Sequence, residues 1–126
     1  MADPSLAELL AGQREALAEA CAVADAEDGV AQARCVQLLN EFAETVRRLA
    51  ARAAELAVLT RDGADRAVVR AATTAVDAAR ADVLRAQLHV VDEWTQITQA
   101  RLGRAQALSE QVGQVCASTS ALTESD

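Results

Sequence analysis

The chain has 126 residues, the size of one domain, and 31 of them are alanine, a residue that favours helix and buries little area. Phe42 and Trp94 are the only aromatic residues and Pro4 is the only proline. The chain therefore lacks the residues from which β-sandwiches and mixed sheets are usually built, and we do not expect either fold. The net charge is -7 and the basic residues, all arginine, alternate with acids, so we expect no nucleic-acid partner.

No run of apolar residues is long enough for a transmembrane segment, and the N-terminus lacks the basic flank and apolar core of a signal peptide. We therefore expect a cytoplasmic protein. Cys21, Cys35 and Cys116 are widely spaced and form no CxxC pair, so neither a zinc site nor a disulfide framework is expected. The sequence predicts no metal and no cofactor.

A first helix is predicted over about residues 5–27. Ser5 and Glu8 have the spacing of a capping box, and Gly29 is suited to end the helix in the left-handed conformation. Its apolar positions recur at steps of three and four: Leu6, Leu10, Leu17, Ala20 and Ala24. If the chain turns at Gly29, Cys21 and Cys35 lie at nearly the same level on the two helices, and whether they pair is left open.

A second helix is predicted over about residues 30–60. Its heptad pattern is the clearest in the chain, and the positions are Cys35, Leu39, Phe42, Val46, Leu49, Ala53 and Leu56. Asp62 and Gly63 repeat the Asp-Gly pair of residues 28–29, and Asp65 follows as a cap for the next helix. This pattern indicates a second turn and a coiled-coil seam.

A third helix is predicted over about residues 64–117, because Gly103 and Gly113 are isolated and do not force a break. The alternative is a fold back near Asp92, which would make a four-helix bundle. Residues 118–126 are small, polar and acidic, and we expect a flexible tail after a single helical domain of residues 1–117.

The third helix carries a β-branched stripe at a seven-residue spacing, formed by Val69, Val76, Val83, Val90 and Ile97. A turn at Gly63 makes the second and third helices antiparallel, so that Leu49 is expected level with Val76 and Cys35 with Val90. A second stripe, Leu84, Leu88 and Val91, makes the apolar face too wide for one neighbouring helix.

The stripe ends at Ile97, because the next heptad position is Arg104. None of the three predicted helices is left to cover the apolar residues that follow in the third helix. We therefore predict that a second copy of the chain, as a homo-oligomer and most simply a dimer, or another helical protein binds there. The predicted partner-binding residues are Trp94, Leu102, Leu108, Val112 and Val115.

No catalytic motif occurs, and His89 has no neighbours with which to build a metal site. Asp92 and Glu93 are adjacent, so in a helix their carboxylates diverge by about 100° instead of converging on a substrate. We expect a protein without enzyme activity. The alternative function is a small-ligand-binding or sensory bundle with a pocket near Trp94 and His89.

In size and acidity the chain is similar to the small helical hairpins that type VII secretion systems export. The WxG motif of their turn is missing, since Trp94 is followed by Thr95 and Gln96, and a chain without tyrosine has no YxxxD/E signal. No family is therefore assigned. The sequence predicts an all-α fold, an elongated antiparallel three-helix coiled-coil hairpin with a long third helix, acting as a structural or interaction subunit.

Overall fold

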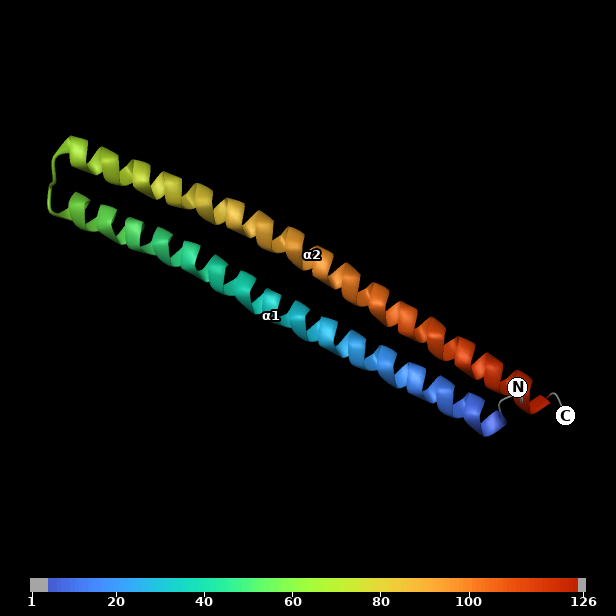
Figure 1. Cartoon of the computed structure of the whole chain (residues 1–126). Helices are drawn as coiled ribbons and strands as arrows, with labels where there is room; N and C mark the ends of the chain where they lie inside the picture. Colours follow the sequence, from blue (N-terminus) through green and yellow to red (C-terminus); the bar gives the residue numbers. More distant parts are fainter. Residues whose placement is uncertain (1–4, 125–126) are drawn as a thin grey trace. The chain divides into compact units, whose positions relative to one another are not determined.

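The computed structural model describes residues 5–124, apart from the side chains of residues 122 and 123, and this part of the chain is all-helical. Two long helices, α1 (Leu6–Arg61) and α2 (Arg66–Glu124), are joined by a turn at Gly63 (Figure 1). The contacts divide the chain into two units: the turn unit, Ala33–Gln96, and the terminal unit, Met1–Gln32 with Ile97–Asp126.

The start of α1 confirms the predicted capping box. The Ser5 amide donates to Glu8 Oε2 at 3.0 Å, and the Glu8 amide donates to Ser5 Oγ at 3.2 Å. Two amides of the first turn that lack a partner within the helix are thereby satisfied by side chains. Helix α1 then begins at Leu6, as the spacing of Ser5 and Glu8 predicts.

The turn at Gly63 is also confirmed. Gly63 has a φ of 68°, in the left-handed region that glycine adopts without steric cost. The Ala64 amide donates to the Leu59 carbonyl at 3.0 Å and the Gly63 amide to the Thr60 carbonyl at 3.3 Å, the two bonds of a Schellman motif. Helix α2 follows directly, and the Val69 amide donates to the Asp65 carbonyl.

The predicted turn at Asp28 and Gly29 is wrong, and so is the three-helix count that depended on it. Both residues lie inside α1, which runs without a break to Arg61. A helical glycine costs about 1 kcal/mol relative to alanine but does not force a break. The Asp28 carboxylate accepts hydrogen bonds from Arg104 of α2. Because Cys21 and Cys35 lie on the same helix, no turn brings them together.

Helix α2 confirms the predicted long last helix and shows that the four-helix alternative is wrong. There is no break near Asp92, since neither glycine nor proline occurs between Ala64 and Leu102 to interrupt the backbone bonds. The helix also continues past Ala117, where we expected it to end, as far as Glu124.

The core of the turn unit is small. Among the described residues of the whole chain, the buried apolar side chains are Leu38, which is 0% exposed, Val76 at 4% and Ala79 at 8%. The valine stripe faces this core, with Val69, Val83 and Val90 half-buried. Arg34 contacts Glu93, which agrees within about one helical turn with the predicted level of Cys35 and Val90.

The predicted seam of residues 35–56 is half correct. Cys35, Phe42, Leu49 and Leu56 are half-buried as expected, whereas Leu39 is 48% exposed and Val46 and Ala53 are also exposed. The row that completes the core contains Leu38, one residue earlier than Leu39. Helix α1 has apolar residues both in the row of Leu38 and in the row of Leu39. Because α2 covers only the row of Leu38, the row of Leu39 is in contact with solvent.

Candidate functional site

A charged bridge joins the two helices of the turn unit. Arg34 Nε donates to Glu93 Oε2 and Arg34 Nη2 donates to Glu93 Oε1, both at 2.9 Å, which is the bidentate geometry that suits a guanidinium and a carboxylate. The hydrogen bond from Arg34 lowers the pKa of Glu93 below its ordinary value, against a smaller opposing effect of burial. The bridge closes one edge of the seam and is a structural contact.

The carboxylates of Asp92 and Glu93 in the turn unit do not converge. Glu93 is engaged by Arg34 and by His89 Nε2 at 3.1 Å, while Asp92 Oδ2 accepts a hydrogen bond from Gln96 on the same helix at 3.4 Å. The two adjacent carboxylates thus face different partners, as the helical geometry predicts. His89 is a surface residue whose side chain is 54% exposed.

The outward side of α2 in the turn unit carries large apolar side chains in water. Leu84 is 61% exposed, Leu88 is 72% exposed and Val91 is 59% exposed, although the chain has few large apolar side chains in its core. Trp94, one of the predicted partner-binding residues, lies beside this row and is 42% exposed. These four residues form the outward patch of α2.

The other predicted partner-binding residues lie in the terminal unit, and the structure separates them into two groups. Leu108 and Val115 are half-buried, on the side of α2 that faces α1, whereas Leu102 and Val112 remain exposed. The expectation that the chain has no helix to cover this region was wrong, because α1 continues through Gly29 and its first half packs there. That these residues bind a partner stays a prediction.

Polar contacts take the place of a buried core in the terminal unit. Arg104 occupies the heptad position after Ile97 and still faces α1, where its Nε and Nη2 donate to Asp28 Oδ1 at 3.0 and 2.6 Å. Its Nε also lies 3.5 Å from Glu27 Oε2. The Thr119 hydroxyl contacts Gln13 Oε1 at 3.5 Å. The seam therefore continues beyond the valine stripe with charged and polar residues.

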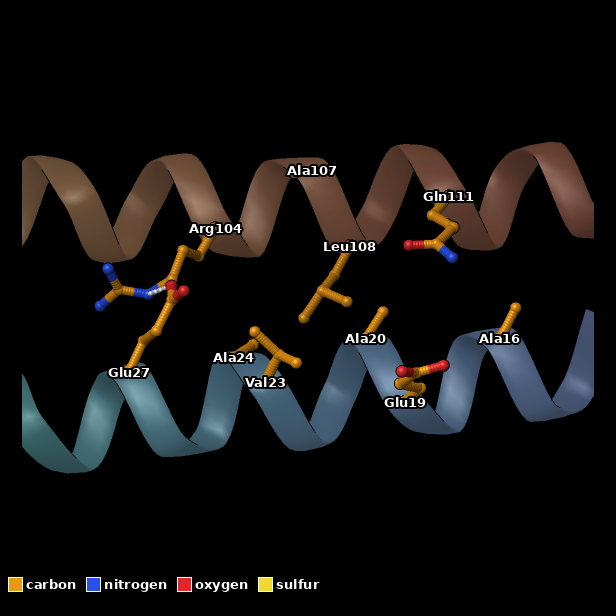
Figure 2. A pocket seen from close by; sticks show the side chains of 10 residues that line it. All are labelled: Ala16, Glu19, Ala20, Val23, Ala24, Glu27, Arg104, Ala107, Leu108 and Gln111. Carbon is orange, nitrogen blue, oxygen red and sulfur yellow. Dashed lines mark ion pairs between the residues drawn. The ribbon is translucent and has the colours of Figure 1, made fainter.

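Beside Arg104 the terminal unit has an open groove of about 440 Å³ between α1 and α2. Figure 2 shows that Leu108 points from α2 toward Ala20 and Ala24 of α1, with the Glu27–Arg104 ion pair at one end and Gln111 toward the other. Three of the six α1 residues that line the groove are alanine, and their side chains do not fill the space between the helices. It is lined by neither Trp94 nor His89.

Sequence reasoning missed the contact between Asp28 and Arg104, because no local pattern links residues that lie far apart along the chain. It found the stripe of Leu84, Leu88 and Val91 but did not place these residues in the predicted site. Their spacing of four and three residues places them on one face of a helix, and this pattern could have identified the surface.

The residues from 5 to 124 include no group of three or more histidines, cysteines or acids arranged to hold a metal ion. None of the described helices has the length and apolar character needed to cross a membrane. Comparisons with protein-family models, with curated proteins and with solved structures found no match to this chain.

Proposed function

We propose that this protein is a non-catalytic structural or interaction subunit, a helical hairpin that homo-oligomerises or docks to another helical protein through α2. The observation that carries the proposal is the outward patch of α2, where Leu84, Leu88, Val91 and Trp94 are all exposed. Apolar side chains gathered on one helical face are typical of surfaces that pack against another helix.

The composition of the core supports the same proposal. The apolar side chains that are buried in the turn unit are few, while Leu84, Leu88, Val91 and Trp94 remain exposed. Transfer of apolar area out of water contributes about 25 cal/mol per Å², so a helix packed on the outward patch would add stabilisation that the hairpin alone does not obtain. A long helix with apolar residues on two sides suits a subunit of a larger helical assembly.

The proposed lack of catalysis rests on the arrangement of the ionisable groups. The glutamate with the perturbed pKa, Glu93, is held by Arg34 in a bidentate structural bridge, and its neighbour Asp92 bonds within its own helix. General acid-base chemistry needs such groups to converge on one substrate. The ligand-binding alternative near Trp94 and His89 stays a prediction, because the groove beside Arg104 is formed by other residues.

Size-exclusion chromatography with light scattering, over a range of protein concentrations, tests the proposal. We expect the mass to rise above the 13.2 kDa of one chain as concentration increases. The Trp94→Ala variant should lose association while its melting temperature changes little, because Trp94 is exposed. A Trp94→Ala variant that melts much earlier and associates normally would instead make Trp94 a part of the core.

A further inference from the structure

Three members of the outward patch, Leu84, Leu88 and Val91, belong to a longer stripe on α2 that follows the heptad pattern of a second helix-packing seam, and Trp94 lies beside it. Within the turn unit the positions are Ala81, Leu84, Leu88, Val91 and Thr95, with successive steps of three, four, three and four. Leu84, Leu88, Val91 and Thr95 are all exposed, and Ala81 is half-buried. The valine stripe that faces α1 lies on a different side of the same helix, so the second seam is available without any change in the hairpin.

Two opposite charges flank this seam on the same side. Arg85 and Asp92 are seven residues apart, which places them at equivalent heptad positions next to the apolar row. Both are exposed. Arg85 is paired within its own helix with Asp82, and Asp92 accepts a hydrogen bond from Gln96. Such exposed contacts within one helix are worth only a few tenths of a kcal/mol and are easily exchanged for others.

We propose that the outward patch binds the same patch of a second copy of this chain, with the two α2 helices antiparallel and related by a two-fold axis. Leu88 then packs against Val91 of the second copy, and Leu84 packs against Thr95 of the second copy. In an antiparallel coiled coil this alignment puts Arg85 opposite Asp92 of the second copy, and the two-fold axis makes the same pair twice. The inference rests on the proposed function and names the partner and the surface.

The charges select this alignment from its neighbours. A shift of the second copy by one heptad in one direction puts Arg85 opposite Arg85, and a shift in the other direction puts Asp92 opposite Asp92. Parallel packing in register would set Arg80 opposite Arg85. Since like charges across an interface are unfavourable, the antiparallel alignment with Arg85 opposite Asp92 is the one of these arrangements that puts opposite charges beside the apolar layers of residues 84–95.

A charge-exchange experiment tests the interface. The variants are Arg85→Asp, Asp92→Arg and the double variant with both changes, and the dissociation constant of the dimer is measured by sedimentation equilibrium at low salt. Each single variant places like charges opposite each other at both symmetric sites. We expect each single variant to raise the dissociation constant about tenfold, because a small unfavourable change occurs at both sites. The double variant should restore the wild-type dissociation constant.

A mixture of the two single variants gives a sharper result. In the mixed dimer every flanking contact is again between opposite charges, so the mixture should dimerise at concentrations where each variant alone is monomeric. Arg47→Asp is the matched control, because Arg47 pairs with Glu44 three residues before it in α1, as Arg85 does with Asp82. It should leave the dissociation constant unchanged. Circular dichroism melting establishes that all the variants are folded.

The outcomes separate this inference from the proposed function. The wild-type protein could associate with a dissociation constant that none of the charge variants changes. This result would overturn the α2 interface and would mean that the chains associate through another surface. The α2 interface is also overturned if neither the double variant nor the mixture restores dimer formation. A wild-type protein that is monomeric at every concentration up to the millimolar range overturns both this dimer and the homo-oligomeric form of the proposed function.

Discussion

The turn unit and the terminal unit are built from the same two helices but differ in what lies between them. The turn unit contains the buried side chains of Leu38, Val76 and Ala79. In the terminal unit no described side chain is buried, and Arg104 contacts Asp28 across the seam beside an alanine-lined groove. The chain therefore forms continuous helix whether or not the space between the helices is well filled.

The difference has a physical cause in the side chains available at the seam. Alanine stabilises helix but contributes little apolar area, and a partly exposed ion pair contributes little net stability because desolvation and side-chain ordering offset the attraction. We therefore expect the turn unit to hold most of the free energy of unfolding and the terminal unit to open more readily.

The largest effect is expected from Leu38→Ala in the turn unit. Leu38 is 0% exposed, and removal of a buried leucine side chain typically costs about 2–5 kcal/mol because it leaves a cavity. Leu39→Ala, at the adjacent and 48% exposed position, is the matched control and should cost well under that amount. Urea unfolding followed by circular dichroism measures both. A loss in Leu39→Ala as large as that in Leu38→Ala would contradict the assignment of Leu38, and not Leu39, to the core.

The two Asp-Gly pairs give the next largest contrast. Gly63→Ala should destabilise the protein by about 1–2 kcal/mol, because Gly63 has a φ of 68° and a Cβ is unfavourable there. Gly29→Ala should stabilise it by about 1 kcal/mol, because Gly29 is helical and an added Cβ meets no atom within 4 Å. Thermal unfolding of both variants measures the signs. A loss of stability in Gly29→Ala would restore the turn that the sequence predicted.

Filling the groove should reduce the difference in stability between the turn unit and the terminal unit. Gln111 is half-buried on the lining of the groove, and Gln111→Leu should add about 0.5–1 kcal/mol by placing apolar atoms against the alanines of α1. Hydrogen exchange measured by mass spectrometry should then slow in the terminal unit and stay the same in the turn unit. Gln114→Leu, at an exposed position of α2, is the control and should leave the exchange in both units unchanged.

The smallest effect concerns pH. Because Arg34 lowers the pKa of Glu93 from its ordinary value of 4.5, the Arg34–Glu93 bridge favours the folded state at neutral pH. This contribution is lost as the pH falls below about 4.5 and through the lowered folded pKa. In Glu93→Gln the difference in stability between pH 7 and acid pH should be smaller than in the wild type. Unfolding by urea at both pH values measures it, and an unchanged difference would remove the bridge as its source.

Several features followed from local patterns alone. The spacing of Ser5 and Glu8 predicted the start of α1, and both hydrogen bonds of the capping box are present. The valine stripe predicted the face of α2 that meets α1, because residues seven apart lie on one side of a helix. Of the predicted partner-binding residues, Trp94, Leu102 and Val112 are exposed, whereas Leu108 and Val115 are half-buried. That these residues bind a partner stays a prediction.

Local patterns failed where two positions with the same residues have different structures. Asp28 with Gly29 and Asp62 with Gly63 have the same sequence, yet only the second pair makes a turn. Arg104 contacts Asp28 from far along the chain, and the first pair stays helical. Likewise, Leu38 and Leu39 are chemically identical, and only the position of α2 decides which one is buried.

Local sequence patterns were thus sufficient for the helical class, the first cap, the turn at Gly63 and the inward stripe of α2. Each of these depends on the conformational preference of a few neighbouring residues or on the period of the α-helix. The packing of the two helices was needed to establish that α1 is continuous, which of its two apolar rows is buried, and which apolar residues of α2 remain exposed. These depend on how much of each helix the other can cover, and one neighbour covers only one side of an apolar face that is wider than itself.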